Sequence, residues 1–145
     1  MKNMTAYPTA CEYLGRVRQA DRRVEWLRER AANMRMLLTD TSVHLTDMPH
    51  SDSPDLQKHE TLHAEIDELE REIAAAEKAT QEVRVEIGIT ISRMTDPISQ
   101  RIMILYYLQN KSWQEAAQEI RYSKAQTFRY RDEGYAELEE MLKAA

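Results

Sequence analysis

The segment 121–131 concentrates side-chain types that bind nucleic acid. It holds four basic residues and no acidic one. Gln126 and Arg129 are types that form paired hydrogen bonds with base edges, glutamine with adenine and arginine with guanine. Lysine, arginine and the amide groups at the start of a helix suit phosphate oxygens. The candidate DNA-binding residues are therefore Lys111, Arg121, Ser123, Lys124, Gln126, Arg129 and Arg131.

These residues are expected around the junction of two helices. Ser112 followed by Glu115, and Ser123 followed by Gln126, each form the capping-box pattern that starts a helix. Only 11 positions separate the two serines, so the first helix must be short and the connection tight. A short helix, a tight turn and a second helix are the layout of a helix-turn-helix, whose second helix enters the major groove of DNA.

A helix that starts at Ser123 should present two different faces, because positions three and four apart share one side of a helix. Beyond Arg131 the sequence becomes acidic, so we expect any DNA contact to end there. A solvated basic face on a structural helix is the alternative interpretation. The residues expected to face outward are Lys124, Ala125, Gln126 and Arg129, and those expected to face inward are Thr127, Tyr130, Gly134 and Leu138.

Residues 59–63, His-Glu-Thr-Leu-His, match the H-E-x-x-H pattern of zinc proteases. Two imidazoles four positions apart on a helix share one face and can hold zinc beside a glutamate base. The motif lies inside a glutamate-rich helical repeat, where a chance match is easy, and no strand-built cleft is expected to supply a third ligand. A weaker zinc site that uses His44 or His50 is disfavoured in the same way. We therefore predict no catalytic residue, no metal site and no cofactor, and a protein that is not an enzyme.

Two long heptad patterns precede the candidate DNA-binding segment. Apolar residues recur at alternating spacings of four and three, an average of about 3.5, which is typical of a coiled-coil seam. Trp26, Met36 and Leu37 lie off the first seam and are expected as a second contact surface. The first seam comprises Tyr13, Val17, Ala20, Val24, Leu27, Ala31, Met34 and Leu38, and the second comprises Leu62, Ile66, Leu69, Ile73, Ala76, Thr80, Val83 and Ile87.

Opposite charges favour the pairing of these two seams with each other as an antiparallel hairpin. Residues 9–38 contain seven arginines and four acids, whereas residues 54–94 contain five lysines or arginines and ten acids. Pairing of the basic helix with the acidic helix is favoured over pairing of either helix with a copy of itself, because like charges repel.

The predicted organisation has three parts. Residues 1–8 form a tail, residues 9–94 form the hairpin with a loop at 39–53, and residues 95–145 form the helix-turn-helix domain. Pro54 and Pro97 mark helix starts, because proline is tolerated at the first helical position. The helix from 97 is expected to continue to about Gln109, since its hydrophobic stretch has no strand partner. The last helix should run from Ser123 to about Lys143 with an interruption at Gly134.

Composition limits the classes of function. The chain has 145 residues and a formal charge of −5, so any nucleic-acid contact must come from a local patch. The single cysteine, Cys11, cannot form an internal disulfide, which favours a reducing compartment. No apolar run approaches 18 residues, and the first residues lack the apolar core of a signal peptide. We therefore expect a cytoplasmic protein with no membrane partner.

The segment 101–131 resembles region 4 of bacterial sigma-70-type factors, which has a buried helix, a Ser-x-x-Glu-Ala-Ala helix start, a turn and a Ser-x-x-Thr helix start. Over most of the chain the pattern is similar to small phage transcription regulators of the RinA/ArpU type. Arg121 stands where that pattern usually has a turn glycine. The resemblance implies that Lys124, Gln126 and Arg129 occupy recognition-helix positions.

The expectation is thus an all-α protein in which an N-terminal antiparallel helical hairpin, a coiled coil, precedes a sigma-like helix-turn-helix bundle. By the resemblance it binds specific double-stranded DNA and regulates phage or prophage transcription in the cytoplasm of a bacterial host cell, as an activator of late genes. The coiled coil is expected to mediate homo-oligomer formation or contact with RNA polymerase. Two alternatives stay open, a DNA-packaging factor of the terminase small-subunit kind and a helical interaction protein that binds no DNA.

Overall fold

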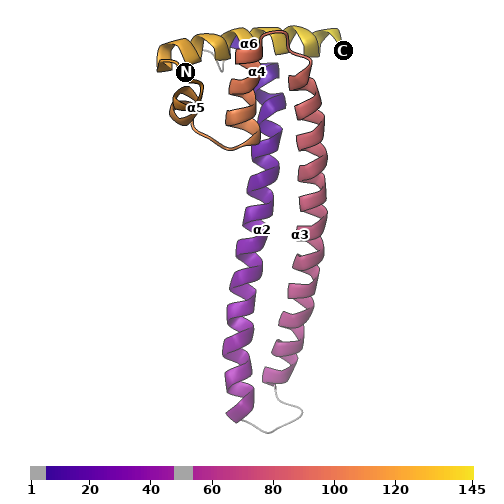
Figure 1. Ribbon diagram of the computed structural model, residues 1–145. Helices are drawn as coiled ribbons and strands as arrows, with labels where there is room; N and C mark the ends of the chain where they lie inside the picture. The colour runs from indigo at the N-terminus through magenta and orange to yellow at the C-terminus, as the bar shows by residue number, and fades with distance from the viewer. Residues whose placement is uncertain (1–5, 48–53) are drawn as a thin grey trace. The chain divides into compact units, whose positions relative to one another are not determined.

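The computed structural model describes the backbone of residues 6–47 and 54–145, and the side chains of 6–40 and 56–145. This described part is helical and contains no strand, so the predicted all-α class is confirmed (Figure 1). Within it, no helix is both long and apolar enough to cross a lipid bilayer. The elements are α2 (Pro8–Asp47), α3 (Pro54–Ser92), α4 (Pro97–Met103), the π-helix η1 (Ile104–Leu108), α5 (Trp113–Ile120) and α6 (Lys124–Ala144).

The helix starts agree with the sequence signals. α3 and α4 both begin at a proline, and Asp96 caps α4 by accepting a 3.0 Å hydrogen bond from the amide of Ile98. Both predicted capping boxes are formed, at Ser112 before α5 and at Ser123 before α6. In each box the serine hydroxyl accepts from an amide three residues on, and the side chain at that position accepts from the serine amide. The starts of α5 and α6 are therefore fixed locally.

Two boundaries differ from the prediction. α2 begins at Pro8 and continues to Asp47, so the predicted loop at 39–53 is wrong for residues 39–47. No glycine or proline lies between Leu38 and Met48, and the threonines and aspartates there have only modestly lower helix propensity. Residues 48–53 lie outside the described part. The helix predicted to reach Gln109 is α4 followed by η1, whose wider turns carry residues 104–108.

The chain divides into two compact units. The terminal unit contains residues 1–20 and 80–145, and the hairpin unit contains residues 21–79. The division falls within α2 and α3, and not at the boundary of 94 and 95 that the sequence predicted. The first residues of α2 and the last turns of α3 therefore belong with the C-terminal helices, because their side chains share one core.

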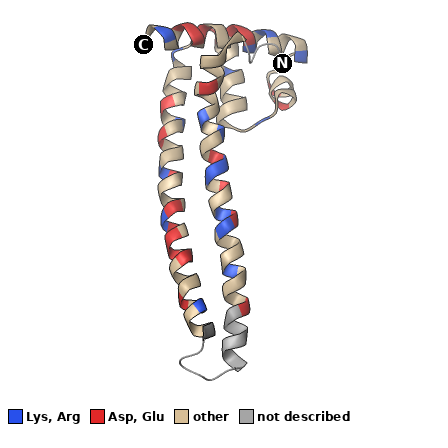
Figure 2. Cartoon of the chain, turned by 180° about the vertical axis from the view of Figure 1, so that it is seen from behind, with Lys and Arg blue, Asp and Glu red and all other residues tan. Residues whose placement is uncertain are grey.

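In the hairpin unit, α2 and α3 pack along the predicted seams. The buried cluster comprises Val24, Leu27, Ala31, Leu69 and Ala76, with Met34 and Ile73 partly buried against it. Arg28 pairs with Glu77, and one heptad further along α2 Arg35 pairs with Glu70 at 3.0 Å. Because the partner number falls as the arginine number rises, the two helices are antiparallel. Figure 2 shows basic residues along α2 and mainly acidic residues along α3, as the charge count predicted.

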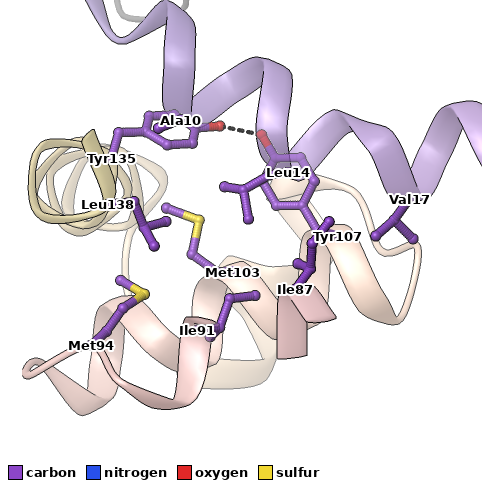
Figure 3. Close-up of a cluster of buried hydrophobic side chains, with 10 residues drawn as sticks. All are labelled: Ala10, Leu14, Val17, Ile87, Ile91, Met94, Met103, Tyr107, Tyr135 and Leu138. Atoms are coloured by element: carbon purple, nitrogen blue, oxygen red, sulfur yellow. Dashed lines mark hydrogen bonds between the residues drawn. The ribbon is translucent and has the colours of Figure 1, made fainter. Parts of the chain in front are cut away.

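The core of the terminal unit brings together the two ends of the chain. Residues from α2, α3, α4, η1 and α6 interdigitate in it (Figure 3). Complete burial of one such aliphatic side chain contributes about 1.5–3 kcal/mol. The cluster consists of Ala10, Leu14, Val17, Ile87, Ile91, Met94, Met103, Tyr107, Tyr135 and Leu138.

Two buried tyrosines form a hydrogen bond inside this core. The hydroxyl oxygens of Tyr107 in η1 and Tyr135 in α6 are 2.6 Å apart (Figure 3). Burial raises the pKa of Tyr107 to about 12 and raises the pKa of Tyr135 as well. Both phenols therefore keep their protons at neutral pH, and one hydroxyl donates to the other, so each has a partner inside the core.

α6 approaches α4 closely at Gly134. A Cβ atom at this position would lie 2.9 Å from Met103 Cε and 3.2 Å from Ser99 Cβ. Ser99 Oγ donates a 2.8 Å hydrogen bond to the carbonyl of Tyr130, one turn earlier in α6. The helix continues through Gly134 without the predicted interruption. The glycine lowers helix propensity by about 1 kcal/mol relative to alanine, and the close contact with α4 accounts for its presence.

Candidate nucleic-acid interface

The connection between α5 and α6 is a tight turn centred on Arg121. Arg121 adopts the left-handed conformation with φ of 62°, and its amide donates to the carbonyls of Ala117 and Gln118. The amide of Tyr122 donates to the carbonyl of Ala117 at 3.1 Å. These bonds end α5 in the manner that usually requires glycine. The turn therefore holds the start of α6 at a fixed position beside α5.

The start of α6 is further organised by its capping box. Ser123 Oγ accepts a 3.1 Å hydrogen bond from the Gln126 amide, and Gln126 Oε1 accepts one of 3.1 Å from the Ser123 amide. The Gln126 side chain is thus held against the helix start. Contact with an adenine edge through both its amide atoms requires release of this bond, which opposes the contact by about 1 kcal/mol.

The outward and inward faces of α6 are those that the sequence predicted. Thr127 and Leu138 are completely buried and Gly134 is buried too, whereas Tyr130 is half-buried. The exposed residues at the start of α6 include no acid. They are Arg121, Ser123, Lys124, Ala125, Gln126 and Arg129.

Lys111 lies apart from this exposed set along the chain and is partly neutralised. Its Nζ is 3.6 Å from Glu119 Oε2, and a third of its side chain is accessible. Glu115, on the same helix as Glu119, accepts from the Ser112 backbone amide and its hydroxyl group, and these bonds lower the pKa of Glu115. α5 therefore presents carboxylates near Lys111, which leaves this lysine weaker than Lys124 as a phosphate ligand.

Arg131 is not available for the role that the sequence assigned to it. Its side chain is only 9% exposed, and its Nε donates to Asp132 Oδ1 at 3.1 Å. The guanidinium carbon lies 4.4 Å from the ring centre of Phe128 and 5.2 Å from that of Trp113. This burial argues against the role of DNA ligand that the sequence predicted for Arg131. The residue faces inward because it follows Thr127 by four positions and so shares the buried side of α6.

An aromatic column positions α5. The rings of Tyr106 in η1 and Trp113 at the start of α5 are stacked with centroids 3.6 Å apart and planes 4° apart. Arg18 of α2 places its guanidinium carbon 3.8 Å above the other face of the Tyr106 ring and donates to the Tyr106 carbonyl at 3.1 Å. Trp113 also meets Phe128 of α6 edge to face. Nothing in the sequence indicated Arg18, because its partner lies 88 positions away.

His59 and His63 of the histidine motif lie close together on α3. The rings of His59 and His63 lie edge to face with centroids 4.7 Å apart. Among the described residues, no group of three or more His, Cys, Asp or Glu side chains is placed to hold a metal ion. The side chains of His44 and His50 lie outside the described residues.

Comparisons of the chain with protein-family models, with curated proteins and with solved structures return no match.

Proposed function

We propose that the chain is a sequence-specific DNA-binding regulator of phage or prophage transcription, and that α5, the turn at Arg121 and α6 act as a helix-turn-helix. The proposal rests on the way the basic residues in the first half of α6 divide between its exposed side and its buried side. Lys124 and Arg129 are exposed beside the exposed Gln126, whereas Arg131 is buried among aromatic rings. Such a rigid, acid-free stripe fits the negative surface of a DNA groove.

Each exposed residue has a role that follows from its chemistry. Arg129 can donate two parallel hydrogen bonds to the O6 and N7 atoms of guanine, and Gln126 can pair with adenine once released from its cap. Arg121 and Lys124 are placed for phosphate oxygens on either side of Ser123, and the amide groups at the start of α6 favour an anion there. Base contacts then supply specificity, while phosphate contacts supply most of the affinity.

The proposed contact is confined to a short surface. The formal charge of the chain is −5, and five acids follow Arg131 within α6. A duplex that continued along α6 would meet the exposed carboxylates among these, those of Glu133 and Glu140, and be repelled. This repulsion favours an orientation in which only the N-terminal half of α6 lies in the groove. In this proposal, the hairpin unit serves contacts with protein partners such as RNA polymerase or a second copy.

Arg129→Ala tests the assignment of the recognition helix. Loss of a bidentate contact to guanine should weaken binding to the preferred duplex by roughly 5- to 100-fold, with little effect on scrambled DNA. Arg22→Ala is the matched control, because Arg22 is also an exposed arginine but lies in the hairpin unit. Equal affinities of wild type and Arg129→Ala for every duplex would contradict the assignment and favour the interaction protein without DNA binding.

A further inference from the structure

The two sides of the hairpin unit differ in how their charges are matched. On one side, the residues that directly follow a seam residue meet across the helices. Arg28 follows Leu27 and pairs with Glu77, which follows Ala76. Arg35 follows Met34 and pairs with Glu70, which follows Leu69. This side is closed by ion pairs within the chain.

The opposite side, which we call the open face, consists of the residues that directly precede each seam residue. In the described part of the hairpin unit, no ion pair joins α2 to α3 on this side. Trp26 is 51% exposed and Leu37 is 52% exposed. The α2 half contains Arg23, Trp26, Arg30, Asn33 and Leu37, and the α3 half contains Glu65, Glu68, Glu72, Ala75 and Ala79.

The α2 half of the open face has the composition of a protein-binding surface. Trp26 is the exposed tryptophan of the hairpin unit, and the guanidinium carbon of Arg30 lies 5.1 Å from its ring centre. Tryptophan and arginine are enriched at the energetic centres of interfaces. Arg23 and Arg30 are exposed and form no ion pair with the described residues, so both are available to pair with carboxylates of a partner.

The α3 half is complementary to it at the same level. The two ion pairs show which residues of α2 and α3 lie at the same height along the hairpin, namely Arg28 with Glu77 and Arg35 with Glu70. In the same antiparallel register, Trp26 lies at the height of Ala79, and Arg30 lies at the height of Ala75. Exposed alanines leave space for a large ring. Glu72 lies one turn from Ala75 and forms no ion pair with an arginine among the described residues. The α3 half therefore supplies negative charges and small side chains, which match the positive charges and the large ring of the α2 half.

We propose that a second copy of the chain packs on the open face by a two-fold rotation about an axis parallel to the helices. This rotation places α2 of each copy on α3 of the other, so that Trp26 covers Ala75 and Ala79 and Arg30 meets Glu72. Each helix in the resulting four-helix bundle is antiparallel to its neighbours, as in common bundles. A two-fold axis that lies in the interface and runs perpendicular to the helices would instead place α2 of one copy against α2 of the other. Arg23 and Arg30 would then face the same arginines of the second copy, and like-charge repulsion disfavours this arrangement.

The sedimentation of the full chain without DNA tests this dimer. We expect wild type to form dimers in a concentration-dependent way at up to about 100 µM, a concentration at which even a weak specific dimer is populated. Trp26→Ala should weaken the dimer by roughly tenfold or more, as for a central interface residue. Glu29→Ala is the control, because Glu29 is exposed but neither directly precedes nor directly follows a seam residue.

A charge exchange separates pairing across the interface from nonspecific effects. Arg30→Glu should weaken the dimer, and the double variant Arg30→Glu with Glu72→Arg should restore it, since both exchanged charges meet again in the second copy. Arg129→Ala should leave the dimer unchanged, so a failure of the DNA-binding proposal is distinguishable from a failure of this one. A monomer at every concentration, or a dimer that Trp26→Ala and Arg30→Glu leave unaltered, would overturn the proposal. Circular dichroism of each variant verifies that the helices remain folded.

Discussion

Glu139 accepts a 2.7 Å hydrogen bond from the backbone amide of Ala10, which lies 129 positions earlier in the chain. A carboxylate at this place satisfies an amide group that the first turn of α2 leaves without a helical partner. It also meets the positive end of the α2 dipole. The last helix of the chain therefore caps the first long one, and the terminal unit is closed by a contact between α6 and α2.

The Glu139 contact should make stability depend on acid pH. Burial alone would raise the pKa of Glu139, but hydrogen bonds from Ala10 and Thr9 outweigh it and lower the pKa below its ordinary value of 4.5. The charged form is thus favoured in the folded state. Its stabilisation is complete above the ordinary pKa and is lost as the pH falls through the lowered pKa.

Glu139→Gln removes this titration and tests the contact. Urea unfolding followed from neutral pH to below the ordinary glutamate pKa should show a shallower acid loss of stability for Glu139→Gln than for wild type. Glu140→Gln is the control, because Glu140 is the exposed neighbour on the same helix. Identical pH profiles for wild type and Glu139→Gln would show that the contact is not maintained in solution.

Tyr135→Phe should lower the free energy of unfolding by about 1–3 kcal/mol, because it leaves the buried hydroxyl of Tyr107 without its partner. The double variant Tyr107→Phe with Tyr135→Phe should lose less than the sum of the two single variants, since no polar atom of the pair is then left alone. Denaturant unfolding of the four proteins measures this coupling. Strictly additive losses would contradict the hydrogen bond.

Arg131→Ala should lower the free energy of unfolding by about 2 kcal/mol, because the guanidinium group lies over desolvated aromatic rings and its methylene stem is packed. Arg129→Ala, on the exposed side of α6, should stay within about 0.5 kcal/mol of wild type. Thermal unfolding of both variants compares two arginines that lie two positions apart. Equal stabilities would contradict the placement of Arg131 in the core.

Arg121→Gly should affect stability and DNA binding in opposite directions. Glycine adopts the left-handed conformation of this turn without the steric penalty of a side chain, so we expect a gain of about 1 kcal/mol in stability. Loss of one phosphate contact should reduce the steepness of the log–log salt dependence of DNA binding by about one. Lys124→Ala should show the same salt effect without the gain in stability. A loss of stability in Arg121→Gly would contradict the turn geometry.

Local signals in the sequence predicted the helices, and periodicity predicted which sides of them are buried. The serines at 112 and 123 start α5 and α6 because a capping box involves only four consecutive residues. The burial of Thr127 and Leu138 follows from helical spacing in the same way. The end of α2 was misplaced because polar residues without glycine or proline can end a helix or continue it.

Contacts between distant residues escaped prediction. Arg131 has the same chemistry as Arg129. Its position four residues after the buried Thr127 is a local signal for the inward side of α6, but the sequence does not show that the ring of Trp113, supplied by α5, packs against it. Arg18 and Glu139 look like ordinary surface charges in the sequence, yet each is bound to a group more than 80 positions away. Such roles depend on the packing of helices, which no local pattern encodes.

A salt titration of DNA binding tests the central claim most directly. Wild-type protein is titrated against short duplexes from the region that flanks its own gene and against scrambled duplexes of equal length, over a range of salt concentrations. The account predicts tighter binding to one duplex, with a log–log salt slope of about −3 to −5 from several phosphate contacts. Equal and weak binding to every duplex would contradict it, and would leave the hairpin unit as the functional surface.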